Sequence, residues 1–95
     1  MKRSFYITEH ALVEMDNDGL EIEDVMRISE SGTLLEDYPD DRPFPSSLKL
    51  GWSGEGTDEP VHVVSAKEPE GRIHIITAYR PDPRKWDESF KKRKK

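Results

Sequence analysis

The stretch covering residues 61–83 constrains the fold most, because it is the one strongly hydrophobic segment of an otherwise polar chain. Two apolar runs rich in β-branched residues, 61–66 and 73–79, flank a short loop of sequence EPEG at residues 68–71. This pattern is typical of a β-hairpin with a tight connection. Both faces of the hairpin carry apolar side chains, so we expect it to lie inside its sheet rather than at an edge.

The alternation of side chains along this hairpin predicts which of them share a face. Pairing Lys67 with Arg72 across the loop puts His62 opposite Thr77, with Tyr79 next along the same face. His62, Thr77 and Tyr79 then form a polar cluster on the sheet. The opposite face is expected to carry His74 and the apolar side chains Val61, Val63, Ile76 and Ala78.

Two helices are expected before the sheet. Thr8 is a good N-cap residue and Gly19 suits the left-handed position after a helix, so the first helix is expected between them. The second is expected over residues 22–31 and is closed by Gly32. Two helices joined by so short a connection are expected to pack as a helical hairpin. The side chains expected to face the core are Ala11, Leu12, Met15, Leu20, Val25, Met26 and Ile28.

Two further strands are expected before the hairpin, over residues 33–38 and 47–52. The second of these alternates apolar and polar residues, which is the period of a half-buried strand. The loop between them, residues 39–45, contains three prolines in seven residues. Because proline restricts the backbone and donates no hydrogen bond, this loop is expected to be stiff and extended.

Residues 84–95 are expected to form a last helix, after Pro81 and Pro83 end the hairpin strand. Trp86 and Phe90 are spaced as i and i+4, which is the spacing of an apolar helical anchor. The basic end of this segment suits the negative pole of a helix dipole. The sequence therefore predicts an α+β domain with two N-terminal helices packed on a four-stranded, mainly antiparallel sheet and a short C-terminal helix.

A chain of 95 residues supports a single core, so we expect one domain over residues 1–90 and a basic tail over residues 91–95. No cysteine is present, which excludes disulfides and thiolate metal sites. The three histidines show no ligand spacing, so no metal or other cofactor is predicted. The N-terminus lacks the apolar core of a signal peptide, and no apolar run reaches the roughly 20 residues that span a bilayer. We therefore expect a cytoplasmic protein without membrane contact.

The net charge of −5 conceals a separation of charge along the chain. Residues 9–41 contain twelve acidic residues and one basic residue, Arg27, whereas the last five residues are all basic. Removing those five leaves 20 acidic and 10 basic residues, and therefore a body with a net charge of −10. The acidic segment fits a basic protein partner, and the basic tail fits the phosphates of RNA. The alternative is a solvated acidic face and a frayed end.

Short motifs run along almost the whole chain: ITEHA at residues 7–11, DYPDDRP at 37–43, PS at 45–46, VHVV at 61–64, and ITAY at 76–79 continuing to PDP at 81–83 and Trp86. In their order and spacing they resemble the family known as domain of unknown function 4258. The resemblance implies a small prokaryotic protein, often encoded beside a zinc-finger protein similar to the antitoxins of mRNA interferases. It also implies kinship with RelE-like ribonuclease toxins and a RelE-like or barnase-like fold. Family members often carry Arg where this chain has Glu14 and Asp18.

RNA cleavage without a metal needs a base for the 2′-hydroxyl, an acid for the leaving 5′-oxygen and a cation at the phosphate. His62 titrates near neutrality and is the candidate base or acid. Tyr79 is the candidate proton donor, and Arg42 on its stiff loop is the candidate phosphate clamp. Thr77 completes the floor of the expected cleft. The alternative for His62 is a hydrogen-bonded packing residue within its strand.

His10 is the remaining catalytic candidate, because it lies four residues before Glu14 on the first helix and the two can form an acid–base couple. It can equally join that helix to the sheet through a hydrogen bond. The RNA-binding candidates are the five basic residues of the tail, Lys91, Lys92, Arg93, Lys94 and Lys95.

Together these residues predict a toxin-type, metal-independent endoribonuclease, similar to an mRNA interferase, that works in a toxin–antitoxin module. Its expected partners are an RNA substrate and a zinc-finger antitoxin protein. The alternative is a non-catalytic protein-binding module whose acidic helical face meets a basic partner.

Overall fold

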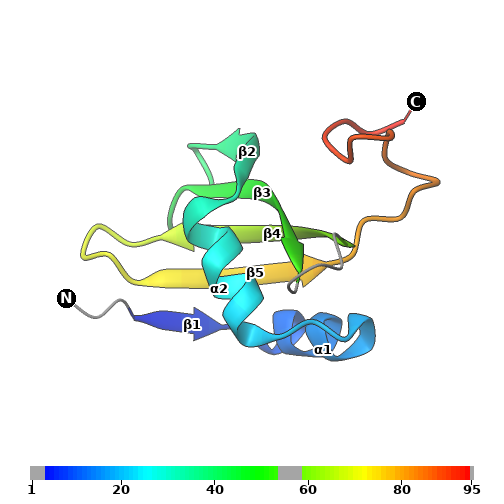
Figure 1. Cartoon of the computed structure of the whole chain (residues 1–95). Helices are drawn as coiled ribbons and strands as arrows, with labels where there is room; N and C mark the ends of the chain where they lie inside the picture. The colour runs from blue at the N-terminus through cyan, green and yellow to red at the C-terminus, as the bar shows by residue number, and fades with distance from the viewer. Residues whose placement is uncertain (1–3, 54–58, 95) are drawn as a thin grey trace.

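The computed structural model describes residues 4–53 and 59–94, which form one sheet with two helices on one of its faces (Figure 1). The strands follow the order β1-β5-β4-β3-β2 across the sheet. The two strands of the predicted hairpin, β4 and β5, therefore lie inside the sheet, as their apolar faces predicted. In chain order the elements are β1 (Phe5–Ile7), α1 (Glu9–Asp18), α2 (Ile22–Ser31), β2 (Thr33–Tyr38), β3 (Ser46–Ser53), β4 (Glu59–Lys67) and β5 (Ile73–Tyr79).

Local capping explains why α1 begins and ends where the sequence predicted. The hydroxyl oxygen of Thr8 accepts a hydrogen bond from the backbone N–H of Ala11 at 3.0 Å. The same hydroxyl donates to the carbonyl of Ile76 at 3.0 Å, which ties the start of the helix to β5. Gly19 ends the helix with a φ of 66°, a left-handed conformation that glycine adopts without steric cost.

The sheet has five strands and is mixed, so the predicted four-stranded, mainly antiparallel sheet is wrong. The additional strand is β1, which pairs in parallel with β5, whereas the other three strand pairs are antiparallel. A strand of three residues is too short to show a period, and its partner lies at the far end of the chain. Only the long-range pairing identifies β1 as a strand.

Each helix makes its main contacts with the sheet rather than with the other helix, so the expected helical hairpin does not form. Helix α1 packs on β5, and α2 packs across β3 and β4 (Figure 1). Leu12 was predicted to face the core, but its side chain is 45% exposed. The buried core beneath the helices consists of Ala11, Met15, Leu20, Val25, Ile28, Val61, Val63, Ile73, Ile75 and Ala78.

No helix follows β5 among the described residues, so the predicted C-terminal helix is wrong. Residues 85–94 instead form a loop in which Trp86 and Arg93 pair as an isolated antiparallel bridge. The carboxylate of Asp87 accepts hydrogen bonds from backbone N–H groups two and four residues further on. Phe90 has a positive φ of 60°. An aspartate that binds the following N–H groups competes with helix formation, and here it overrides the i, i+4 spacing of the aromatic residues.

A β-bulge between Val64 and Ser65 changes the predicted register of the hairpin. Tyr79, rather than Thr77, lies opposite His62, and Thr77 lies opposite Val64. Two steps make this difference of two positions: Lys67 pairs with Ile73 rather than with the predicted Arg72, and the bulge then shifts every later pair by one further position. This shift is what brings the imidazole of His62 directly beside the phenol of Tyr79.

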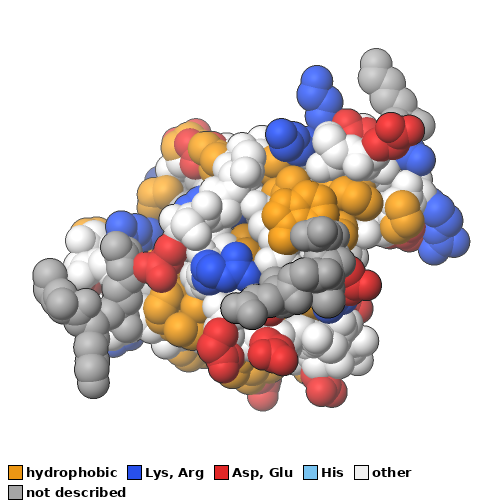
Figure 2. Space-filling view, viewed as in Figure 1, with side chains coloured by type: hydrophobic (Ala, Val, Ile, Leu, Met, Phe, Trp, Pro, Cys, Tyr) orange, Lys and Arg blue, Asp and Glu red, His pale blue; other side chains and the backbone are white. Residues whose placement is uncertain are grey.

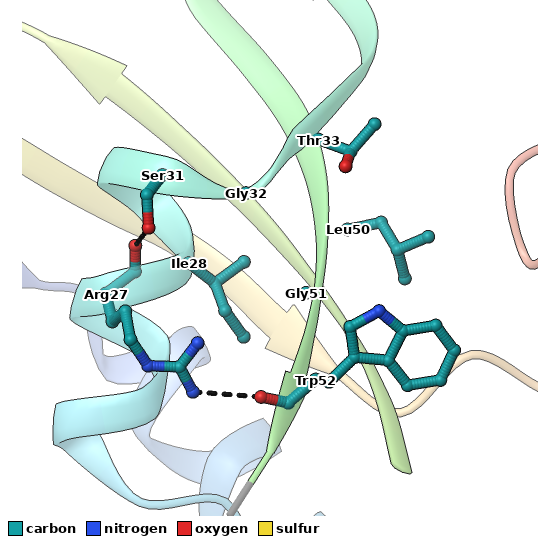
Figure 3. A pocket seen from close by; sticks show the side chains of 8 residues that line it. All are labelled: Arg27, Ile28, Ser31, Gly32, Thr33, Leu50, Gly51 and Trp52. Atoms are coloured by element: carbon teal, nitrogen blue, oxygen red, sulfur yellow. Dashed lines mark hydrogen bonds between the residues drawn. The ribbon is translucent and has the colours of Figure 1, made fainter. Parts of the chain in front are cut away.

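Helix α2 lies directly on the backbone of β3, with the side chain of Ile28 over Gly51 (Figure 3). A Cβ atom on Gly51 would come within 2.8 Å of Cδ1 of Ile28, which is closer than packed carbon atoms approach. Arg27 also joins α2 to β3, because its Nη2 donates a hydrogen bond to the carbonyl of Trp52 at 2.9 Å. The separation of helix and strand therefore depends on the missing side chain at position 51.

Replacing Gly51 with Ala is expected to destabilise the fold by about 1–3 kcal/mol, the usual cost of overpacking a core. The free energy of unfolding is measured by urea titration. Ile28→Ala alone leaves a cavity and is expected to cost about 2–5 kcal/mol. In the double variant the new methyl group occupies part of that cavity, so the combined cost falls below the sum of the two. If the costs of Gly51→Ala and Ile28→Ala simply add in the double variant, direct contact between the two positions is not the cause of the destabilisation.

Candidate functional site

His62 lies in the middle of β4 and is completely buried, with 0% of its surface exposed. Its Nε2 is 2.8 Å from the carbonyl oxygen of Phe90, and its Nδ1 is 3.2 Å from the hydroxyl of Tyr79. Because a carbonyl only accepts, Nε2 carries the proton of the neutral ring and Nδ1 accepts from the hydroxyl. Both ring nitrogens are therefore satisfied without solvent, as a buried imidazole requires.

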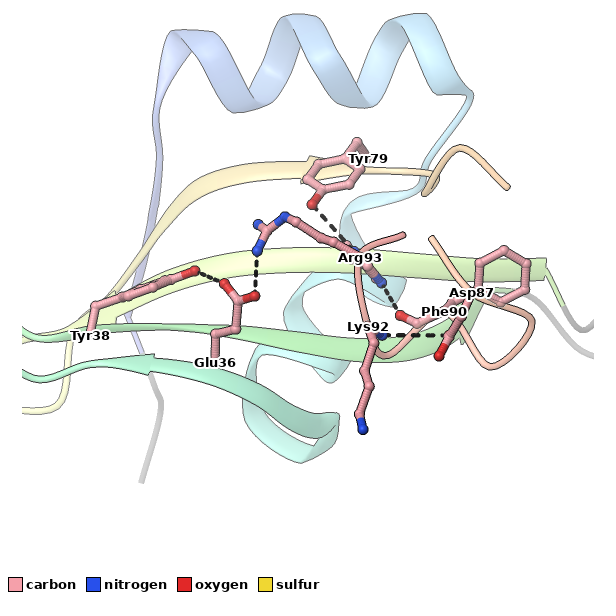
Figure 4. A network of polar contacts seen from close by, with 8 residues as sticks. Glu36, Tyr38, Tyr79, Asp87, Phe90, Lys92 and Arg93 are labelled. Carbon is pink, nitrogen blue, oxygen red and sulfur yellow. Dashed lines mark hydrogen bonds and ion pairs between the residues drawn. The ribbon is translucent and has the colours of Figure 1, made fainter. Parts of the chain in front are cut away.

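The C-terminal loop covers His62. The ring of Trp86, which is 5% exposed, meets the imidazole edge to face with the centroids 4.3 Å apart and the planes at 89°. The guanidinium of Arg93 lies over the Trp86 ring, 4.8 Å from its centroid, and pairs with Glu36 on β2 (Figure 4). Edge-to-face and cation–π contacts both favour such a stack. The imidazole is sealed between the sheet and this loop.

Glu36 joins the loop to the outer strand of the sheet. One of its carboxylate oxygens pairs with Arg93, and the other accepts a hydrogen bond from the hydroxyl of Tyr38 (Figure 4). The hydrogen bond to Glu36 raises the pKa of Tyr38, since losing the proton would place two negative charges side by side. Residues from β2, β4, β5 and the loop thus form one connected polar network.

Burial sets the protonation of the central pair. It lowers the pKa of His62, because a charged ring would lack water, and the hydrogen bond to the Phe90 carbonyl opposes this shift. Burial also raises the pKa of Tyr79. At neutral pH the pair is therefore a neutral imidazole that accepts a hydrogen bond from a neutral phenol. This is the chemistry of a base beside a proton donor, but the closed loop keeps the ring of His62 away from solvent.

Thr77 is half-buried on β5, two residues from Tyr79 and therefore on the same side of the strand. His74, by contrast, was expected to face away from His62. It lies between two core residues of β5, which places its side chain on the face opposite the helices, the same face as His62. There its Nε2 is 2.5 Å from a carboxylate oxygen of Glu68.

His10 and Arg42 lie away from the central pair. His10 is on the outside of α1 with its side chain 65% exposed, and its Nε2 is 4.0 Å from a carboxylate oxygen of Glu14. Arg42 is exposed in the loop between β2 and β3. Among the described residues, no hydrogen bond or ion pair joins either of them to His62 or Tyr79. The fold gathers His62 and Tyr79, with Thr77 as their neighbour, from the five predicted catalytic residues.

The basic residues of the predicted tail have two different surroundings. Arg93 takes part in the cover over His62, whereas Lys91, Lys92 and Lys94 are exposed on the loop. Lys95 lies outside the described residues. Figure 2 shows acidic side chains along the lower edge of the molecule, over α1 and the start of α2, and a mixture of Lys, Arg and acidic side chains around the C-terminal segment at the upper right. The helical edge is therefore mainly acidic, whereas the basic residues of the C-terminal segment lie at the other end of the molecule.

Sequence reasoning missed Glu36 and misread Trp86 and Phe90. Glu36 is one of twelve acidic residues in residues 9–41, and nothing in the sequence distinguishes it from the others. Trp86 was assigned to a helix, although Asp87 and the serine two residues later form a typical turn sequence that favours a loop. That aspartate was the signal that could have placed the aromatic residues on a loop.

Within residues 4–53 and 59–94, no cluster of three or more histidine, aspartate or glutamate side chains is arranged to hold a metal ion. No helix in this part of the chain combines the length and the apolar character needed to cross a bilayer.

The family model described as Domain of unknown function (DUF4258) matches residues 7–80. The chain belongs to this family. The match includes His62, Tyr79 and Glu36, and it ends before the loop that covers them. Neither a curated protein nor a solved structure matches the chain. The likeness to RelE-like toxins stays a prediction.

The lowered pKa of His62 predicts that acid destabilises the fold. The unfolded chain binds a proton at this residue near pH 6.5, whereas the folded chain does so only at lower pH. The contribution of His62 to the free energy of unfolding is therefore constant above about pH 6.5. It falls below that pH until the pH reaches the pKa of His62 in the folded chain. Urea unfolding across this range should show a loss in the free energy of unfolding of the wild type that is absent from His62→Gln. The other titrating groups are the same in both proteins, so their contribution cancels when the two profiles are compared. Parallel stability profiles would contradict it.

Proposed function

We propose that the chain is a non-catalytic protein-binding module whose acidic helical face docks a basic segment of a partner. The observation that carries this proposal is a pair of exposed apolar side chains on α1. Leu12 and Val13 are 45% and 59% exposed, although the adjacent Ala11 and Met15 already supply the buried face of the helix. Neighbouring apolar residues exposed in a polar surround are typical of an interaction site.

The surroundings of this apolar pair indicate the chemistry of the partner. On a helix, Glu9 lies one turn from Val13, and Asp16 lies one turn from Leu12. Glu9 and Asp16 are both exposed, and the body of the chain carries a net charge of −10 without its last five residues. A partner segment with apolar residues flanked by Lys or Arg would bury the apolar pair and neutralise its rim.

The closed state of His62 also favours binding over catalysis. A general base must come within hydrogen-bond reach of the proton that it removes. Here both nitrogens of His62 are engaged by groups of the same chain, and the ring is 0% exposed. The α1 surface, in contrast, is open to a partner without any rearrangement.

The docking surface can be tested with a synthetic amphipathic peptide of Leu and Lys. We expect binding by calorimetry that weakens about tenfold or more in the double variant Leu12→Asn/Val13→Asn. Fully burying one aliphatic side chain contributes on the order of 1.5–3 kcal/mol, and each of these two has about half of its surface left to bury. The variant keeps every charge, so electrostatic attraction is unchanged. Leu34→Asn is the matched control, because Leu34 is 55% exposed on β2, away from α1.

Unchanged binding by the α1 variant would overturn the docking proposal, since the peptide would then be held by charge alone. An equal loss in Leu34→Asn would overturn it as well, because the effect would not be specific to α1. A peptide of Leu and Glu supplies the charge control and is expected not to bind.

The endoribonuclease of a toxin–antitoxin module is a second candidate function. It is favoured by one observation, the hydrogen bond between the neutral imidazole of His62 and the hydroxyl of Tyr79, close to a loop that exposes Lys91, Lys92 and Lys94. Such a pair can move a proton, and exposed cations can hold the phosphates of RNA. In this case the loop moves before catalysis, and a zinc-finger antitoxin is the expected partner.

If the second candidate holds, purified protein cleaves RNA and its induced expression arrests growth. Both effects are expected to disappear in His62→Gln and in Tyr79→Phe, because one loses the base and the other the proton donor. Circular dichroism checks that each variant is folded, and His10→Gln tests whether the exposed histidine contributes. Intact RNA after incubation with folded wild-type protein, together with normal growth, would leave the binding module as the function.

A further inference from the structure

The loop that covers His62 is organised by its own contacts rather than by the sheet. We call residues 81–94 the strap. The carboxylate of Asp87 accepts from the backbone N–H and the hydroxyl of Ser89 at 3.1 and 2.8 Å. The strap is closed at its base by two backbone hydrogen bonds, from Lys94 to Lys85 at 2.8 Å and from Asp87 to Lys92 at 2.9 Å. These bonds lie within the strap, so they persist if the strap leaves the sheet.

The strap is joined to the sheet at a fixed point. Arg80, the last residue before it, is held by α1 and β4: its backbone N–H donates to the carboxylate of Asp18 at 2.9 Å, and its guanidinium pairs with Glu59 at 2.9 Å. Pro81 and Pro83 follow directly, and proline lacks the N–H that would continue a strand. Movement of the strap therefore leaves the end of β5 in place.

Within the part of the chain that the structure describes, contacts of three kinds attach the strap to the face of the sheet. The ring of Trp86 packs on His62, the carbonyl of Phe90 accepts from Nε2 of His62, and Arg93 pairs with Glu36. Arg93 keeps 58% of its side chain exposed, so water competes for this ion pair. The strap thus presents an aromatic ring, a carbonyl and a cation to the sheet.

We propose that the strap is displaceable and that the sheet surface beneath it is a second docking site, for a partner segment that carries an aromatic residue and a cation in the same arrangement. The strap itself shows what this surface binds: a flat ring on His62, a backbone carbonyl at Nε2 and a guanidinium at Glu36. The family match supports the division, because the surface lies within residues 7–80 and the strap lies beyond them. A partner segment of this kind replaces each strap contact with an equivalent one.

The proposal is tested by supplying the strap as a separate molecule. The probe is a fluorescein-labelled synthetic peptide with the sequence of residues 81–95, added to full-length protein and followed by fluorescence anisotropy. Full-length Trp86→Ala, whose own strap lacks the ring, is expected to bind the peptide at least about tenfold more tightly than wild type does. A peptide that carries Trp86→Ala and Arg93→Glu is the matched control and is expected not to bind.

Two further variants separate this site from the α1 surface. Glu36→Arg in the Trp86→Ala protein is expected to abolish binding of the normal peptide and to restore binding of a peptide with Arg93→Glu. Leu12→Asn/Val13→Asn in the Trp86→Ala protein is expected to leave the affinity unchanged, because the α1 surface plays no part. Loss of binding in that last variant would overturn the second site and leave the proposed function intact.

Hydrogen exchange in the wild type gives a test that needs no substitution. The Nε2–H of His62 loses its bond to the Phe90 carbonyl when the strap leaves, so its protection against exchange is expected to be at least about a hundredfold lower than that of the backbone N–H groups of Val61 and Val63 in the core. Equal protection of the imidazole and the core N–H groups would overturn the proposal, because the strap would then open only when the whole fold unfolds. Peptide binding that is equal in wild type and Trp86→Ala would also overturn it.

Discussion

The burial of His62 is the constraint on which the rest of this structure depends. An imidazole without solvent needs a partner at each nitrogen, and an unsatisfied buried polar group costs about 1–3 kcal/mol. The bulge in the hairpin supplies the first partner by placing Tyr79 opposite His62. The strap supplies the second through the Phe90 carbonyl. The register of the sheet and the path of the C-terminus therefore satisfy the same ring.

This arrangement divides the molecule into two faces with different chemistry. The face beneath the helices is a continuous apolar core, and its outer helical surface is acidic with two exposed aliphatic residues. The opposite face carries His62 and the polar network of Glu36, Tyr38 and Arg93, and a basic segment covers it. The first surface offers exposed aliphatic side chains with an acidic rim, and the second offers the ring of His62 beside the single carboxylate of Glu36, so they suit different kinds of partner. A small domain can in this way present two separate docking surfaces.

The catalytic and binding hypotheses differ in whether a substrate can reach His62 and Tyr79 beneath the strap. His62 and Tyr79 have complementary proton chemistry, and the sequence singled them out for that reason. Their pKa shifts, however, arise mainly from burial rather than from a charged neighbour. Burial of this kind is equally the signature of a structural histidine. What the pair does therefore depends on whether the strap opens, and not on the two side chains alone.

The sequence by itself determined the two helices, the four longer strands and the pairing of β4 with β5 inside the sheet. Each of these follows from a local signal, such as the Thr8 cap, Gly19 or a run of β-branched residues. Tertiary structure alone decided the rest: the three-residue strand β1, the bulge that sets His62 opposite Tyr79, the exposure of Leu12 and the position of the strap over His62. The physical reason is that these features depend on groups far apart along the chain. A short strand exists only when its partner is present, and Trp86 lies on His62 only because the fold brings the C-terminal segment back over β4.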